Sequence, residues 1–296
     1  MESLTRRRLS RIPIAAACTA LAIATIGAAK SGRFEQGGVF ALLDSSPKIV
    51  AKFWPDNVNG LRATLKVRQF TLDGKTPILN YDVDMEHIMH LVVVRDDFAT
   101  FAHLHPGFDA ATGTFWQDFT KEAHHRYYVY ADSMPRGLGQ QVFRFTLENA
   151  GAVAPSAPAL TASSGMVTAG PYTVRLSQTA LAANRPTNLQ ITILENGQPA
   201  HDLGLYLGAA AHAVFINTST LAYVHLHPRA RDEAGGAADS TREMTADGAM
   251  NMSESKAGPF LAMSVPGLPA APYKLWIQFL GNGGTVYTAP FTLLVR

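Results

Sequence analysis

The stretch that decides the fold occurs twice, as HLVVVRDDFATFAHLHP at residues 90–106 and as HAVFINTSTLAYVHLHP at residues 212–228. Both copies open on a histidine and close on His-Leu-His-Pro, at a constant offset of 122 residues (212 against 90). The offset also holds upstream, where Pro77 aligns with Pro199. A fixed offset kept over about thirty residues indicates two copies of one structural unit.

Each copy consists of short runs typical of β-strands, separated by turn residues, and no stretch keeps an apolar period of 3.6 residues. The expected strands of the first copy are 61–70, 78–83, 88–95, 99–105, 114–119, 126–131 and 141–147. Those of the second are 172–177, 187–194, 202–207, 212–217, 221–227, 259–265, 273–280 and 285–295. About seven strands over about 110 residues predict an immunoglobulin-like β-sandwich, so we expect an all-β chain with two such domains in tandem.

The boundaries of these domains follow from composition. We expect an N-terminal export signal over residues 1–29, a first β-sandwich over 45–148, a linker over 149–170 and a second β-sandwich over 171–296. The linker is rich in Ala, Ser, Pro and Gly and has no apolar period. Within the second unit, the polar segment 229–258 is expected to be a mobile insert.

The N-terminus indicates export. Arg6, Arg7 and Arg8 precede an uncharged, apolar stretch that ends in small residues, which is the pattern of a signal peptide and resembles a twin-arginine signal. The predicted location is therefore periplasmic or secreted, with no stable membrane span after cleavage. A signal that is retained as an anchor is the alternative.

Composition excludes several kinds of function. Cys18 is the only cysteine and lies inside the predicted signal, so the mature chain would have no disulfide and no thiolate for a blue-copper centre. The formal charge of +2 becomes −1 when the four arginines and one glutamate of the signal are removed. Nothing in this balance indicates a nucleic-acid partner.

The first copy of the repeated stretch can be folded as a hairpin. If its turn is centred on Asp96-Asp97, His90 lies opposite His103 on the neighbouring strand. His105 lies two residues further along and therefore on the same face. This hairpin would gather three imidazoles.

The second copy folds in the same way, with its turn centred on Thr218-Ser219. His212 would lie opposite His225, and His227 would share their face. Imidazole is the usual nitrogen ligand of Cu(II) and Zn(II), so each hairpin predicts a metal site, with copper preferred to zinc. The alternative is that these histidines hydrogen-bond to loops and only brace the fold.

Two further groups of residues suit copper. Met85 and His87 come just before the first hairpin, and Met250 and Met252 lie in the insert of the second unit. Thioether sulfur is a soft ligand suited to Cu(I), whereas imidazole serves both oxidation states. We therefore include these four residues among the candidate ligands.

The sequence resembles a largely uncharacterised group of exported bacterial proteins with tandem immunoglobulin-like units. The resemblance rests on LYLGAAAH at 205–212, AYVHLHP at 222–228, the first hairpin with YYVYADSMPRGLGQQV at 127–142, and PYKLWIQFLGNGGTVYTAPFTL at 272–293. It covers residues 45–296. Members of the group are often described as associated with heavy metals or copper, which implies metal handling for this chain.

Three functions compete. The first is a periplasmic or secreted protein that sequesters or carries copper, with the metal ion as its partner and any protein partner unknown. The second is a non-catalytic binding or scaffold module with structural histidines. The third is a double-cupin enzyme, but a cupin places a glutamate three or four residues after His-x-His, and neither Pro106-Gly107-Phe108-Asp109 nor Pro228-Arg229-Ala230-Arg231 contains one. We therefore expect a protein that is not an enzyme.

Overall fold

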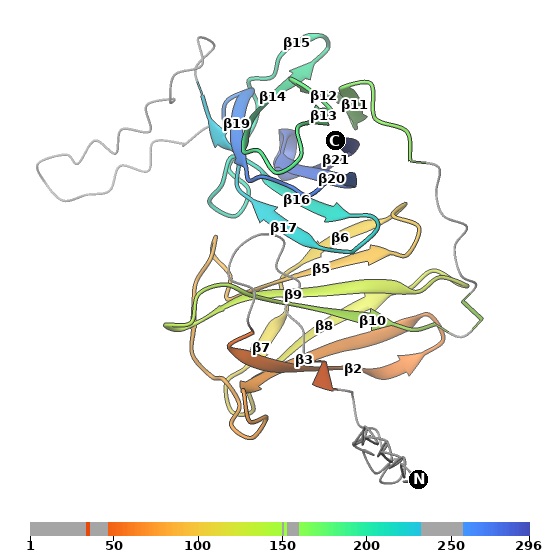
Figure 1. The fold of residues 1–296 in the computed structure, drawn as a ribbon, viewed down its shortest axis with the longest axis vertical. Coiled ribbons are helices and arrows are strands. Elements are labelled where there is room, and N and C mark those ends of the chain that lie inside the picture. Colours follow the sequence, from red (N-terminus) through yellow and green to blue (C-terminus); the bar gives the residue numbers. More distant parts are fainter. Residues whose placement is uncertain (1–33, 36–46, 150, 153–159, 232–256) are drawn as a thin grey trace, which may run out of the picture. The chain divides into compact units, whose positions relative to one another are not determined.

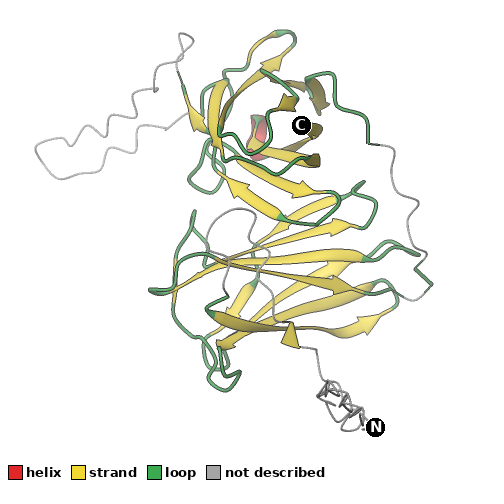
Figure 2. Cartoon of the chain, viewed as in Figure 1, coloured by secondary structure: helices red, strands yellow, loops and turns green. Residues whose placement is uncertain are grey.

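The computed structural model describes residues 34–35, 47–149, 151–152, 160–231 and 257–296, all within one compact unit, Gly32–Arg296. This described part is almost entirely β-structure, and its only helix is the short 3-10 helix η1 (Asn282–Gly284) (Figure 2). The prediction of an all-β chain is confirmed. The predicted signal, Cys18, Met250 and Met252 lie outside the described residues.

Two sheets make up the first half of the chain (Figure 1). Its strands are β1 (Phe34–Glu35), β2 (Ile49–Asn59), β3 (Arg62–Thr71), β4 (Tyr81–Asp82), β5 (Met89–Arg95), β6 (Phe101–Leu104), β7 (Gly107–Asp109), β8 (Thr114–Thr120), β9 (Tyr127–Pro135) and β10 (Gln141–Leu147). One sheet has the order β1-β2-β3-β8-β7, and the other has the order β10-β9-β5-β6 with β4 beside β9. Alternate side chains of both sheets, such as Leu65, Val67, Leu91, Val93 and Phe143, meet in one core.

The second half repeats this arrangement. Its strands are β11 (Met166–Ala169), β12 (Tyr172–Leu176), β13 (Ala180–Leu181), β14 (Thr187–Glu195), β15 (Gln198–Pro199), β16 (His212–Asn217), β17 (Tyr223–Leu226), β18 (Arg229–Ala230), β19 (Phe260–Val265), β20 (Ala271–Leu280) and β21 (Val286–Val295). The sheets have the orders β11-β12-β14-β19-β18, with β15 beside β14, and β13-β21-β20-β16-β17. Ile191, Ile193, Phe215, Leu275 and Phe291 belong to their common core.

The duplication is visible in the strand orders. β10-β9-β5-β6 corresponds to β21-β20-β16-β17, and β2-β3-β8-β7 corresponds to β12-β14-β19-β18. Strands β6 and β17 keep the offset of 122 residues at both ends. The sequence repeat therefore reflects two copies of one arrangement of strands.

The observed strands differ from the expected ones in several places. Met166–Ala169, inside the predicted linker, pairs with β12 as an edge strand, so the connection between the halves is shorter than 149–170. β2 was not expected, because Pro55 and Asp56 interrupt its pattern, yet nine of its residues pair with β3. The expected strand 202–207 contains only two isolated bridges, at Gly204 and Tyr206.

β5 and β16 are buried on both faces, and this brings the two halves together. One face of each strand belongs to the core of its own half. On the other face, Val92 and Val94 of β5 share a second cluster with Val214, Ile216 and Trp276. A strand that is covered on both faces is apolar at every position instead of at alternate positions. Residues 92–94 of β5 (VVV) and 213–216 of β16 (AVFI) show this pattern.

Aromatic stacking across this contact obeys an approximate two-fold symmetry. Phe101 of β6 stacks on Trp276 of β20, with ring centroids 4.8 Å apart. Its counterpart Tyr223 of β17 stacks on Tyr130 of β9 at 5.0 Å. In each half, the second strand of the hairpin (β6 or β17) therefore packs against an inner strand of the other half (β20 or β9).

Candidate metal centre

The first hairpin has a different register from the expected one. Val92, not His90, pairs with His103, so that His90 lies at the level of His105. The reason is the turn: the Arg95 N–H donates to the Thr100 carbonyl at 3.2 Å, which leaves a four-residue loop. The predicted register was wrong by two residues. Because two residues are one strand period, the three histidines still share a face.

The second hairpin shows the same shift. Val214 pairs with His225, and the Asn217 N–H donates to the Ala222 carbonyl at 2.8 Å. The expected pairing of His212 with His225 was therefore also wrong by two residues. The common face is again preserved.

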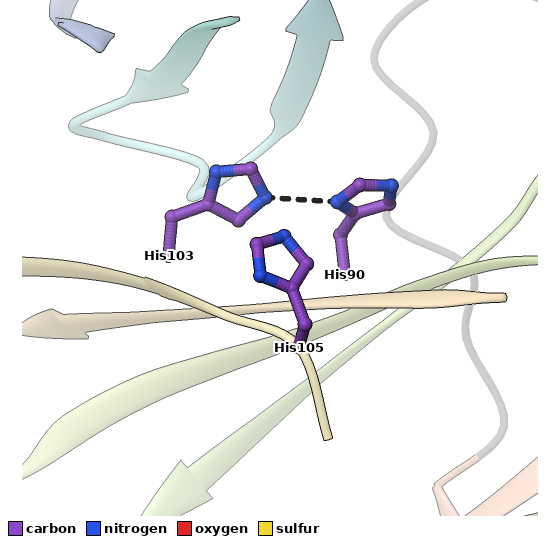
Figure 3. A group of neighbouring side chains, drawn as sticks. All are labelled: His90, His103 and His105. Atoms are coloured by element: carbon purple, nitrogen blue, oxygen red, sulfur yellow. Dashed lines mark hydrogen bonds between the residues drawn. The ribbon is translucent and has the colours of Figure 1, made fainter. Parts of the chain in front are cut away.

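Six histidines come together as two trios. The first trio is His90, His103 and His105 (Figure 3), and the second trio is His212, His225 and His227. Ring centroids lie 4.8–5.2 Å apart within the first trio and 4.6–5.4 Å apart within the second. Each hairpin thus gathers the three imidazoles that the sequence predicts for it.

The trios are not separate, which the sequence did not indicate. His90 lies 5.2 Å from His225 between ring centroids, and His103 lies 5.2 Å from His225 and 5.4 Å from His212. These distances equal those within a trio. The two hairpins therefore build one cluster of six imidazoles where the halves meet.

Two groups of three histidines within this cluster have ligand geometry. The nitrogens of the first trio lie within 4.8 Å of one another, as do those of His103, His212 and His225. The second group takes a histidine from each half and omits His227. His103 therefore belongs to both groups, and the ligand set expected for the second hairpin stays a prediction.

Hydrogen bonds determine which nitrogens of the first trio can bind a metal. His90 Nε2 lies 3.0 Å from the Asp84 carbonyl oxygen, and His103 Nδ1 lies 3.0 Å from Gln278 Oε1. Both oxygens only accept, and the Gln278 amide is oriented by its NH₂ group, which donates to Thr288. Both rings therefore carry their hydrogen on the outer nitrogen. Their inner nitrogens, His90 Nδ1 and His103 Nε2, face each other at 3.0 Å with lone pairs.

The second trio repeats this arrangement in part. His212 Nε2 lies 3.0 Å from the Tyr206 carbonyl oxygen, whereas His225 Nδ1 lies 3.5 Å from Asp132 Oδ2 without forming a hydrogen bond. The inner nitrogens, His212 Nδ1 and His225 Nε2, are 3.2 Å apart. Metal-binding histidines characteristically donate their second N–H to a carbonyl or carboxylate, and two nitrogens that bind one ion at about 2.0 Å lie about 3 Å apart.

Burial keeps four rings of the cluster neutral. It is the main cause that lowers the pKa of His103 and His225 well below the ordinary value, and neighbouring histidines lower it further. The same causes lower the pKa of His212 to about 2 and that of His105 to about 3. Near neutral pH these four rings therefore each keep one lone pair on a ring nitrogen. Neutral imidazole is the form that binds metal ions.

Some nitrogens of the cluster are buried without a hydrogen-bond partner. His105 Nε2, its counterpart His227 Nε2, and His225 Nδ1 are in this state. Buried polar atoms without a partner are rare in folded proteins, and each calls for an explanation such as an ion. An all-nitrogen donor set of this kind fits copper or zinc.

Asp132 is the buried carboxylate next to the cluster. It accepts hydrogen bonds from the Gln140 amide through both oxygens and from the Tyr223 hydroxyl at 3.2 Å, and burial raises its pKa to about 6. Asp132 of β9 is the strand partner of His90 of β5, and its Oδ2 atom lies 3.5 Å from Nδ1 of His225 in the other half. Gln278 of β20 is likewise the strand partner of His212 of β16, and its Oε1 atom lies 3.0 Å from Nδ1 of His103 in the other half.

Sequence reasoning missed this crossed pair of acceptors. Asp132 and Gln278 are counterparts at an offset of 146 residues, not 122, because the segment after Pro228 lengthens the second copy. Alignment of the strands that follow this segment would have shown them.

The residues just before the first hairpin form a tight turn. Asp84 and His87 exchange backbone hydrogen bonds at 2.8 and 3.0 Å, with Met85 and Glu86 in the left-handed region (φ 42° and 70°). The turn brings the His87 ring onto His105, stacked at 4.0 Å. His87 therefore lies beside the first trio, while roles for Met85 and His87 as ligands stay predictions.

Comparisons with known proteins leave the function open. Residues 166–296 match a family model described as a domain of unknown function (DUF8832). No curated protein matches the chain. Within the described residues, no helix has the length and hydropathy needed to span a membrane.

The solved structures that resemble the chain are distant. One is a laminaripentaose-producing β-1,3-glucanase of glycoside hydrolase family 64 from Paenibacillus barengoltzii in complex with laminarihexaose (12% identity, 80% of this chain, 50% of that chain, TM-score 0.24). Another is trypsin-activated alpha-2-macroglobulin from Escherichia coli (10% identity, 83% of this chain, 15% of that chain, TM-score 0.21). The chain thus spans half or less of the length of these structures.

Proposed function

We propose that the protein is an exported metal-binding protein that sequesters or carries copper through its histidine cluster. One observation carries the proposal: in both hairpins the inner nitrogens of two imidazoles face each other at 3.0–3.2 Å. In three of these four rings the outer nitrogen lies 3.0 Å from a carbonyl or amide oxygen, and in the fourth, His225, it lies 3.5 Å from a carboxylate oxygen without a hydrogen bond. A cation between the inner nitrogens makes this arrangement favourable.

Copper is the proposed metal. Imidazoles without a thiolate or a coordinating carboxylate suit Cu(II), and for equal geometry divalent copper binds more tightly than zinc. The proposed fold is two immunoglobulin-like β-sandwiches in tandem, and the proposed location is periplasmic or secreted, after cleavage of residues 1–29. The resemblance to exported proteins associated with copper or heavy metals supports this proposal.

Titration tests the metal-binding proposal. Protein freed of metal with a chelator is titrated with CuSO₄ and ZnSO₄ in a calorimeter, beside the variants His103→Ala and His201→Ala. We expect tighter binding of copper than zinc, loss of binding in His103→Ala and no change in His201→Ala, whose histidine is exposed and outside the cluster. Equal copper uptake by wild type and His103→Ala would contradict the proposed site. Fractionation of cells that produce the full chain tests its export.

A structural role of the histidines is the second candidate. The cross-half contacts of His103 with Gln278 and of His225 with Asp132 would also hold the two halves together without a metal. The protein would then be a binding or scaffold module. The same titration separates the candidates, because a scaffold takes up no copper in any variant.

A further inference from the structure

We infer that the two trios form a single dinuclear centre that binds a pair of copper ions close enough to interact. This inference rests on the proposed function and adds the number of ions and their coupling. Each ion would be bound chiefly by the histidines of one hairpin. The pair would lie where the two halves of the chain meet.

Two positions for an ion follow from the lone pairs. One lies at His90 Nδ1 and His103 Nε2, and the other at His212 Nδ1 and His225 Nε2. Each position has a third imidazole beside it, His105 or His227. The Nε2 atoms of these two rings are buried and have no hydrogen-bond partner. The first position therefore offers three nitrogens within 4.8 Å of one another, the usual number of protein ligands that leave one coordination site open, and the second offers two with His227 beside them.

The two positions are too close to be independent. His103 belongs to both groups of nitrogens that lie within 4.8 Å of one another. The rings of His103 and His225, one from each position, have their centroids 5.2 Å apart. Two ions bound here would therefore be near neighbours, as in two-metal sites of proteins, whose ions lie roughly 3.5–4 Å apart.

Nearby carboxylates offset part of the charge of two ions. Asp132 is buried and lies 3.5 Å from His225. Asp84 and Asp132 both act electrostatically on His227. Two carboxylates beside six imidazoles reduce the cost of bringing two cations into a buried site.

The approximate two-fold symmetry gives an independent reason to expect two ions. The inner nitrogen pair, the outer acceptor and the unpartnered third imidazole all occur in both halves. A site for a single ion would use one such set or would place the ion on the symmetry axis. In the first case the buried Nε2 atom of the third imidazole in the other half would stay without a partner.

Copper content and electron paramagnetic resonance test the inference on the whole protein. After loading with CuSO₄ and removal of excess, we expect two copper ions per chain. Their integrated resonance signal should fall well below the copper content, with a half-field transition, because the two spins interact. His90→Ala and His212→Ala should each keep one ion whose signal accounts for all of its copper. His201→Ala is the matched control and should behave as wild type.

The outcomes separate this inference from the proposed function. One ion per chain that depends on the cluster, or two ions whose signals integrate fully as isolated centres, would overturn the dinuclear centre and leave copper binding in place. No copper uptake would overturn both. The wild-type spectrum is decisive by itself, so the test stands even if a variant fails to fold, which circular dichroism would show.

Discussion

The two trios have histidines at equivalent positions but differ in what surrounds them. Just before the first hairpin the chain has Met85, Glu86 and His87. The aligned positions of the second half are Leu207, Gly208 and Ala209. Yet His90 and His212 donate to carbonyl oxygens at equivalent positions, Asp84 and Tyr206. A backbone carbonyl is available from any residue, so this contact survived the divergence of the side chains.

Side-chain acceptors diverged more. The Asp132 carboxylate faces His225 of the second trio, while the neutral Gln278 amide oxygen faces His103 of the first trio. A carboxylate raises the basicity of the ligand that donates to it more than an amide does. The geometry of the histidines is therefore common to both halves, whereas the charge of the side chain that faces their outer nitrogens is not.

The largest expected effect is a difference in copper binding between a substitution at His103 and one at its counterpart His225. His103 belongs to both nitrogen groups and His225 to one, so His103→Ala should weaken the binding of both ions, and His225→Ala that of one. We expect each loss to exceed the roughly 10–100-fold cost of removing a hydrogen-bonding neighbour of a ligand. Copper content after dialysis against a weak chelator measures this. Equal losses in the two variants would show that the halves are equivalent.

Acid should destabilise the metal-free protein. Histidines whose pKa is lowered in the folded state take up protons only on unfolding, so stability is full above about pH 6.5 and falls below it. Each fully buried imidazole contributes a loss of about 1.4 kcal/mol per pH unit. Asp132 acts in the opposite direction, because its pKa is raised to about 6 and its cost is relieved as the carboxyl is protonated.

Urea unfolding of chelator-treated protein at about pH 7.5 and about pH 5 measures this sum. The histidines outnumber the one carboxylate, so the midpoint should fall with pH. The His225→Asn variant should show a smaller pH dependence, by about one proton. A midpoint that rises on acidification would contradict the buried neutral state of the cluster.

A smaller effect should follow from Asp132→Asn. Removing the carboxylate that faces His225 should lower copper affinity at the second trio by roughly tenfold. The stability of the metal-free protein should not fall, since an unfavourably buried charge is removed. Asp118→Asn on β8 is the control for the same chemical change elsewhere. Unchanged affinity in Asp132→Asn would mean that the two acceptors are interchangeable.

The smallest effect concerns the two turns. Glu86 has φ 70° and its counterpart Gly208 has φ 73°, a region that costs a residue with a side chain about 1 kcal/mol. Glu86→Gly should therefore raise the free energy of unfolding by about 1 kcal/mol, and Gly208→Ala should lower it by a similar amount. A Cβ on Gly208 would lie 3.5 Å from Glu86 Oε1, so it would cause no clash. Urea unfolding at neutral pH measures both changes.

Local patterns in the sequence predicted part of this structure. The alternation of residues and the paired His-x-His segments predicted strands and placed three imidazoles on one face of each hairpin. The register could not be derived, because the centre of the turn depends on the backbone bonds at Arg95 and Asn217. β2 was missed because pairing with β3 stabilises a segment that contains Pro55.

The meeting of the two trios depends on contacts between distant residues. Val92 and Val94 had a visible signal, since an unbroken apolar run indicates a strand covered on both faces. That signal does not say what covers the second face. The partnership of His225 with Asp132 required the three-dimensional arrangement, because the offset between the copies changes after Pro228.

The approximate two-fold symmetry has a consequence for assembly. It is the geometry of an isologous dimer, in which the same surface patch serves both subunits. A dimer of separate chains would dissociate on dilution and would lose a centre built from both subunits. Here the connection between β10 and β11 makes the encounter intramolecular, at an effective concentration on the order of millimolar. A single molecule can therefore bring its own two trios together, however dilute the protein is.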